Sequence, residues 1–239
     1  LSKSYKKLQT LHPSDLADII EDLGRTASAE VFSALDDEQA ADVLEELEVE
    51  TQLHIIKSLP IEKVADVLDK MPADEVADIF DALGDEKVEL LLNEMEKDAS
   101  QEVRELLDYP NNEVGSIMST EVLSFNQNAT IEEVFTVLRT QKPEAESLYN
   151  LFVINENDVL IATFSLRDLV VSAPETKISQ IMKPSPVRLY DDQEVDEIAE
   201  FVSKYNMLAI PVVDRSEVLQ GMVVIDDVID DLLDKRRMK

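Results

Sequence analysis

The sequence predicts a multidomain chain, in which an all-α, right-handed superhelical repeat domain precedes two copies of a small α/β module. Two observations lead to this fold class. A short apolar phrase returns at a constant interval through the first half, and the second half contains two related segments. Self-similarity of this kind is typical of chains built from repeated supersecondary units.

The first half repeats a seven-residue phrase whose third, fourth and seventh positions are apolar. Its eight occurrences are Ala17–Leu23, Ala29–Leu35, Ala41–Leu47, Leu53–Leu59, Ala65–Met71, Ala77–Leu83, Glu89–Met95 and, more weakly, Gln101–Leu107. This spacing is the stripe of a short amphipathic helix, and Arg104 alone interrupts it. Because helices of about two turns are not stable alone in water, we expect them to stack and bury the common stripe.

The second half repeats itself in two registers. Ile117-Met118 returns as Ile181-Met182. The segments Leu151–Ile154 and Ser165–Asp168 return as Ile210–Val213 and Val224–Asp227, at a shorter offset than the first pair. The first copy therefore holds five extra residues, which we place in the loop around Gln141–Ser147. We expect Met118 and Met182 to be core residues of their own copies.

Each copy is predicted to have the order βαββα. In the first copy, the capping box Thr130–Glu133 opens a helix that ends near Gln141. Strands are expected at 150–155 and 159–164, with a helix from Leu166; in the second copy, helices are expected over 193–205 and from Ile225. The turn-rich stretch 108–112 separates the two halves. The predicted domains are therefore 1–109, 110–176 and 177–239.

Composition excludes several classes of protein. The net charge of −30 would repel the phosphate backbone, so we expect no nucleic-acid partner. The chain has no cysteine, which removes disulfides, thiolate metal sites and cysteine nucleophiles. It has no apolar run near the roughly 20 residues of a spanning helix and no signal peptide. It begins without methionine and ends inside a predicted helix, so we expect a fragment.

Carboxylates are the candidate ligands in this sequence. Asp74 and Asp78 are four residues apart on a predicted helix, and the predicted helix from Ile225 carries the same spacing in Asp227 and Asp231. Like charges at this spacing destabilise a helix unless something neutralises them. An all-oxygen donor set selects hard cations such as Mg²⁺. The alternative is that these acids form a solvated face and bind nothing.

The βαββα copies resemble a tandem pair of cystathionine-β-synthase-type (CBS) domains. The whole chain is similar to the cytosolic region of MgtE magnesium channels, a resemblance carried by the acidic repeats that open with His12–Leu16, by Ser165–Leu169 and by Val224–Val228. In that family, Mg²⁺ bound between the repeat and CBS domains favours a compact state that shuts the pore. The resemblance also implies a homodimer through the CBS domains, joined to its own transmembrane domain at the cytoplasmic face of the membrane.

The resemblance implies particular residues. The expected Mg²⁺ ligands are Asp42, Asp74, Asp78, Asp196, Asn206, Asp227 and Asp230, where Asn206 replaces an expected acid. The basic residues Lys235–Arg237 would begin the plug helix that connects to the pore. CBS pairs also bind adenine nucleotides, which implies a nucleotide site on Ser165, Arg167 and Asp168 and makes ATP a second candidate ligand.

Two other functions remain open at this point. A nucleotide-sensing module is the alternative reading. The expected nucleotide-stacking positions, Asn150 and Met207, are not aromatic, which counts against it. An acidic helical scaffold that docks a protein partner would explain the repeats but not the CBS pair. The sequence shows no nucleophile elbow, P-loop or His-centred triad, and we predict that the chain is not an enzyme.

Overall fold

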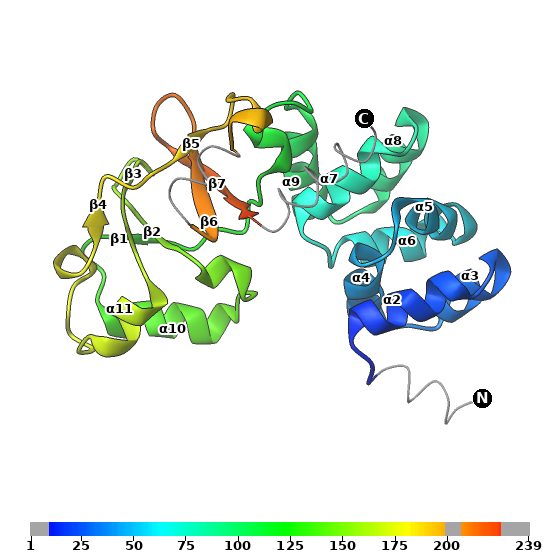
Figure 1. Ribbon diagram of the computed structural model, residues 1–239, viewed down its shortest axis with the longest axis horizontal. Coiled ribbons are helices and arrows are strands. Elements are labelled where there is room, and N and C mark those ends of the chain that lie inside the picture. Colours follow the sequence, from blue (N-terminus) through cyan, green and yellow to red (C-terminus); the bar gives the residue numbers. More distant parts are fainter. Residues whose placement is uncertain (1–9, 199–206, 226–239) are drawn as a thin grey trace. The chain divides into compact units, whose positions relative to one another are not determined.

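The computed structural model describes residues 10–198 and 207–225 and divides the chain into two compact units, residues 1–107 and 108–239. We call them the repeat unit and the paired unit (Figure 1). In the part of the chain that the structure describes, none of the helices combines the length and apolar composition needed to cross a bilayer.

Short helices build the repeat unit, as predicted. They are α2 (Pro13–Asp22), α3 (Arg25–Ser33), α4 (Asp37–Glu45), α5 (Val49–Ser58), α6 (Ile61–Leu68), α7 (Ala73–Asp81), α8 (Asp85–Glu94) and α9 (Lys97–Leu107). Helix starts follow local chemistry: Asp36 caps α4 by accepting the Gln39 N–H at 3.0 Å, and prolines precede α6 and α7. Most of the predicted stripe is buried, for example at Val43 and Leu44 in α4 and at Ile79 and Phe80 in α7, whereas Ile19 in α2 is exposed.

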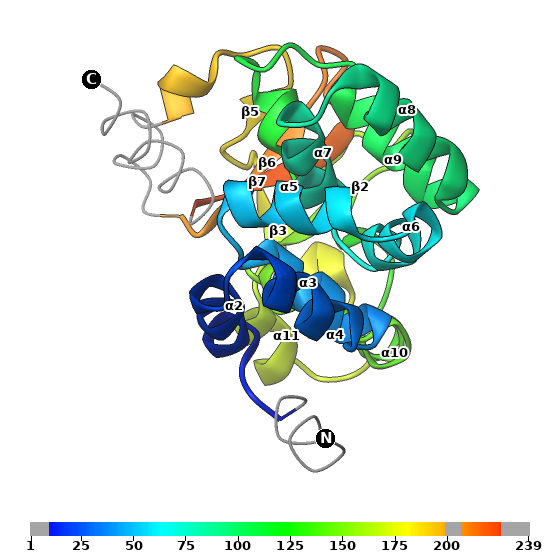
Figure 2. The same cartoon turned by 90° about the vertical axis from the view of Figure 1, so that its right-hand side faces the viewer.

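Each repeat helix packs mainly on the helix two positions further along the chain. These pairs are α2 with α4, α4 with α6, α6 with α8, and likewise α3 with α5, α5 with α7 and α7 with α9; the consecutive helices α2 and α3, and α8 and α9, also contact each other. The helices therefore form two columns, and the two views in Figures 1 and 2 show the short helices stacked along the unit. Arg104, which interrupts the apolar stripe, pairs instead with Glu89 through two contacts of 3.0 and 3.1 Å.

The paired unit contains two sheets. The first copy supplies η1 (Val114–Ile117), β1 (Ser124–Asn126), α10 (Ile131–Gln141), η2 (Glu146–Leu148), β2 (Leu151–Ile154), β3 (Leu160–Phe164) and α11 (Leu166–Val171). The second copy supplies η3 (Ile178–Gln180), β4 (Lys183–Pro184), β5 (Leu189–Tyr190), η4 (Val195–Glu197), β6 (Ala209–Val213) and β7 (Leu219–Val224). The βαββα order of the first copy is confirmed. The helix that was expected from Ile225 lies almost wholly outside the described residues.

The sheets have matching topologies. The first has the order β1-β2-β3-β4, with β1 and β2 parallel and the other pairs antiparallel; the second has the order β5-β6-β7, with β5 and β6 parallel. Figure 1 shows α10 and α11 beside the first sheet. Ile131, Val134 and Leu169 of these helices pack against Leu151 and Val153 of β2. Phe152, which alternates with these two strand residues, packs instead with the second sheet.

The two copies exchange segments, which the sequence did not indicate. Strand β4 of the second copy completes the first sheet by pairing with β3, and Met182 packs in the first copy's core. Conversely, Ser119 of the first copy pairs with Met222 of β7, and Met118 contacts Gly221 in the same strand. The expectation that each methionine packs within its own copy is therefore wrong. The pairing is long-range, and a local repeat pattern carries no information about it.

One predicted helix starts later than expected. The helix expected over 193–205 begins as the 3-10 turn η4 at Val195, and residues 199–206 lie outside the described part of the chain. Gln193 and Glu194 are engaged elsewhere: the Gln193 carbonyl accepts the Val114 N–H at 2.8 Å, and Glu194 forms a bridge with Glu113. Because the backbone groups of Gln193 and Glu194 make these contacts, the helix begins after them.

Candidate functional site

Acidic residues at the second repeat position lie at the surface of the repeat unit. The acids at this position, Asp18, Glu30, Asp42, Asp66 and Asp78, are all exposed. Because helices pack two apart, the acids of consecutive repeats do not share a column; those of α2, α4 and α6 share one column. His54 takes this position in the other column, and its Nε2 lies 2.7 Å from the Arg25 carbonyl oxygen. The acids at this position are therefore divided between the two columns.

Three predicted cation ligands lie on two helices of the repeat unit. Asp42 is on α4, and its pKa is raised by partial burial and then by the negative charges of Glu38 and Asp36. Asp74 and Asp78 lie one turn apart on α7, where Asp74 is half-buried and Asp78 is exposed. A cation beside Asp42 would relieve the repulsion that raises its pKa.

The other predicted ligands belong to the paired unit. Asp196 is exposed in η4, whereas Asn206, Asp227 and Asp230 lie outside the described residues. Within residues 10–198 and 207–225, no three acidic or histidine side chains gather closely enough to hold a metal ion. The predicted ligand set is therefore not brought together by the residues that the structure describes, and it stays a prediction.

The predicted nucleotide residues have a local structural role. Ser165 is the N-cap of α11: its Oγ donates to Asp168 Oδ2 at 2.6 Å and accepts the Asp168 N–H at 3.2 Å. Lys183 Nζ lies 3.6 Å from the same carboxylate, and exposed Arg167 lies 3.9 Å from its other oxygen. The Ser-x-x-Asp spacing that suggested a ribose contact thus also makes a capping box. Asn150, at an expected stacking position, donates to the Ala209 carbonyl at 2.6 Å.

The pH dependence of stability tests the capping role of Asp168. The bonds from Ser165, together with Lys183, lower its pKa below the ordinary range, although burial opposes the shift. A lowered pKa stabilises the fold at pH above the unfolded value near 4, and this contribution disappears as the pH falls through the folded pKa. We expect Asp168→Asn to unfold more easily than the parent chain at pH 6. We expect this difference to narrow towards pH 3, as measured by urea unfolding. A difference independent of pH would contradict the assignment.

Sequence reasoning missed two carboxylates that hold the repeat helices together. Glu21 accepts the Glu48 N–H at 2.7 Å, and Asp69 accepts the Glu96 N–H through both oxygens at 2.9 and 3.1 Å. Both acids occupy the fifth position of the repeat phrase, and each is separated from the amide that it caps by the same length of chain. That shared spacing is the signal that could have identified them.

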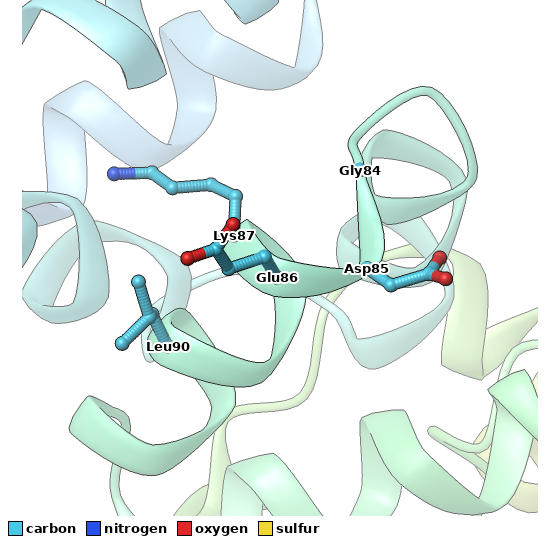
Figure 3. A pocket seen from close by; sticks show the side chains of 5 residues that line it. All are labelled: Gly84, Asp85, Glu86, Lys87 and Leu90. Carbon is cyan, nitrogen blue, oxygen red and sulfur yellow. The ribbon is translucent and has the colours of Figure 1, made fainter.

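A shallow depression of about 600 Å³ lies at the start of α8, lined by Gly84, Asp85, Glu86, Lys87 and Leu90. Figure 3 shows Glu86, Lys87 and Leu90 on one side of the helix, with Asp85 pointing away. None of the predicted cation or nucleotide residues lines it. This depression is therefore not the candidate site.

Comparison with known proteins decides the family. The model of the MgtE intracellular N domain matches residues 11–112, and the CBS domain model matches residues 114–174 and 178–234. A crystal structure of the cytosolic domain of the Mg²⁺ channel MgtE in complex with ATP is 32% identical, covers 95% of this chain and 92% of its own, and superposes with a TM-score of 0.88. The chain belongs to the MgtE family. It has the N-terminal helical domain and the CBS pair of that family's cytosolic region.

Other MgtE proteins agree in architecture. A crystal structure of the soluble part of a magnesium transporter has a TM-score of 0.91, is 25% identical and covers 98% of this chain and 94% of its own. The magnesium transporter MgtE of Thermus thermophilus is 37% identical over 129 residues, 54% of this chain, and that of Bacillus subtilis is 34% identical over 139 residues, 58% of this chain. The matched segments span 29% and 31% of those two relatives. The MgtE chain described here thus corresponds to a minor part of each curated relative.

Proposed function

We propose that this chain is the magnesium-sensing regulatory region of a magnesium channel or transporter, placed at the cytoplasmic face of a membrane. One observation carries the proposal: a solved cytosolic domain of the Mg²⁺ channel MgtE shares both domains in the same order over 95% of this chain. Its role is regulatory and not enzymatic. Its partners would be a second copy of itself, held through the CBS domains, and its own transmembrane domain.

The chemistry of the proposed ligands suits Mg²⁺. Six are carboxylates and the seventh, Asn206, offers an amide oxygen, so the set is all-oxygen, which hard cations prefer. Mg²⁺ commonly binds through one or two carboxylates and keeps several waters. A site assembled from one or two acids of each unit would therefore suffice.

The proposed mechanism follows from charge. The chain carries −30 overall, so acidic surfaces repel each other over distances near the ~8 Å screening length at physiological salt. Mg²⁺ bound between the repeat and paired units would offset this repulsion and favour a compact, closed state. A cation shifts the population between open and closed states by the ratio of its affinities for them. The basic segment Lys235–Arg237 would pass that shift to the pore.

Removing two ligands tests the proposal. In the parent chain, millimolar Mg²⁺ at constant ionic strength, set with K⁺, should protect the 108–112 linker from limited proteolysis. Asp74→Asn combined with Asp78→Asn should require about tenfold more Mg²⁺, which corresponds to losing one charge-assisted contact. Asp85→Asn combined with Glu86→Gln removes the same charge from α8 and serves as the control.

Two outcomes would contradict the proposal. If linker cleavage of the parent chain does not respond to Mg²⁺, the acids are only solvated. If the α8 control shifts as much as the α7 variant, the effect is general charge screening and not binding at the proposed ligands.

Nucleotide sensing is the second candidate, because the 32%-identical MgtE structure was solved in complex with ATP. In this chain ATP would contact Ser165, Arg167 and Asp168, and Asp168 would have to exchange part of its capping bonds for the ribose. Titration with fluorescent ATP distinguishes the candidates. Saturable micromolar binding that Ser165→Ala weakens would support ATP as a modulator beside Mg²⁺, and no binding would remove it.

A further inference from the structure

One type of hydrogen bond recurs between helices of the repeat unit. The acid at the fifth position of a phrase accepts the backbone N–H that precedes the helix three places further on, 27 residues along the chain. Glu21 of α2 accepts the Glu48 N–H, which precedes α5. Asp69, at the end of α6, accepts the Glu96 N–H, which precedes α9. We call this bond a cross-helix cap. The first of these caps spans α2–α5, and the second spans α6–α9.

Cross-helix caps from the first group of helices to the second cannot form, for chemical reasons. The partner of Ser33 in α3 would be the amide of Pro60, and proline carries no N–H. The partner of Glu45 in α4 would be Pro72, which also carries none. In α5 the fifth position is Lys57, whose ammonium group donates hydrogen bonds and cannot accept them. Each cap that would join the two groups therefore lacks its donor or its acceptor.

Apolar packing and the side chain of Lys63 cross the boundary between the groups. Helix α4 packs on α6, and α5 packs on α7. Lys63 of α6 donates to the Leu35 carbonyl at 3.2 Å and pairs with Asp37. Apolar contacts are non-directional, and the lysine head is carried on a flexible four-carbon stem. These contacts therefore hold the groups together but fix their angle less firmly than a bond to a backbone amide does.

We propose that the repeat unit consists of two blocks, α2–α5 and α6–α9, and that it bends and opens at the boundary between α5 and α6. The boundary runs through the two-residue connection Leu59–Pro60. This inference goes beyond the proposed function and does not depend on it. Asp42 lies in the first block, whereas Asp74 and Asp78 lie in the second. Bending would therefore change the distance between these proposed ligands.

Amide-resolved hydrogen exchange tests the two blocks. Glu21→Ala should accelerate amide exchange about tenfold in α2–α5, because it removes a charge-assisted bond, and should leave α6–α9 at the parent rates. Asp69→Ala should have the reverse effect. Glu30→Ala is the control, because it removes an exposed acid of α3 that is not at the fifth position. If either capping variant accelerates both blocks equally, the repeat unit opens as one body and the proposal is wrong.

A designed cap tests why the blocks are not joined. Lys57→Glu supplies an acceptor for the N–H of Gly84, which precedes α8 and has the same extended backbone as Glu48 before α5. Exchange of the Gly84 amide should be about tenfold slower in Lys57→Glu than in Lys57→Ala, which removes the ammonium group without adding an acceptor. Equal rates in the two variants would show that the missing acceptor is not what leaves the blocks unjoined, and would overturn the proposal.

Distance measurements test bending itself. The chain has no cysteine, so Asp18→Cys and Glu102→Cys allow spin labels to be attached to one block each and compared by double electron–electron resonance. The distribution of distances between them should be narrower in Lys57→Glu than in Lys57→Ala. A pair within the first block, Asp18→Cys with Val49→Cys, should give the same width in both variants. A distribution between the blocks that is as narrow in Lys57→Ala as in Lys57→Glu would contradict bending at this boundary.

Discussion

Replacing Phe152 with alanine should lower the free energy of unfolding of the paired unit by about 3–5 kcal/mol, the usual cost of truncating a buried phenylalanine. Phe152 is fully buried in β2, on the side that faces the second sheet. It packs in one cluster with Ala209 and Val213 of β6 and Met222 of β7. The cavity would therefore weaken the contact that joins the copies, and both should unfold together.

Urea unfolding followed through amide signals from β6 and from α10 measures this effect. The unfolding midpoints from both sets of signals should move to lower urea concentration by the same amount, because the copies share the Phe152 cluster and exchange segments. Gln141→Ala at the exposed end of α10 is the control and should change stability by no more than about 0.5 kcal/mol. If only the first-copy signals shift, the copies are independent and our account of their shared core is wrong.

Local sequence patterns predicted the repeat helices well. The third, fourth and seventh positions of each phrase identify the buried stripe, because a short helix must bury its apolar face whatever its neighbours are. Which helices become neighbours was not predictable in this way. All the phrases are alike. No single phrase therefore shows that α4 packs mainly on α2 and α6. The sequence pattern therefore does not show which of the acids at the second position lie on adjacent helices.

Long-range pairing limited the prediction of the paired unit. The duplication predicted two copies with the same strand order, and the capping box at Thr130 and Glu133 fixed the start of α10. The exchange of β4 and Ser119 between the copies depends on which strand edges meet in space, which the repeat does not encode. The sequence offset from Ile117-Met118 to Ile181-Met182 is longer than the offset from Leu151–Ile154 to Ile210–Val213. This difference indicates only that a loop is longer in the first copy.

The candidate site could be predicted as chemistry but not as geometry. Paired acids are suitable ligands for a hard cation, but a site that combines residues from two units depends on how the units meet. Ser165 and Asp168 show the opposite difficulty, because one spacing serves both a helix cap and a ribose contact. Sequence spacing alone does not separate those roles, whereas the hydrogen bonds between Ser165 and Asp168 identify the helix cap.

Val170→Lys should convert the proposed homodimer to a monomer. Helix α11 exposes apolar side chains, with Val170 64% and Val171 65% exposed and Leu166 39% exposed. We propose that the homodimer through the CBS domains buries this face. Placing an unpaired charge in such an interface costs roughly 3–5 kcal/mol, which weakens association by about two to three and a half orders of magnitude.

Sedimentation velocity over a range of micromolar concentrations measures the association. Leu90→Lys is the matched control, because Leu90 is also an exposed apolar helix residue, at 52%, but belongs to α8 of the repeat unit. It should leave the dimer intact, since the proposed contact lies in the CBS pair. A parent chain that sediments as a monomer would contradict the dimer, and a dimeric Val170→Lys chain would move its interface away from α11. The two variants together therefore separate the existence of the dimer from the surface that forms it.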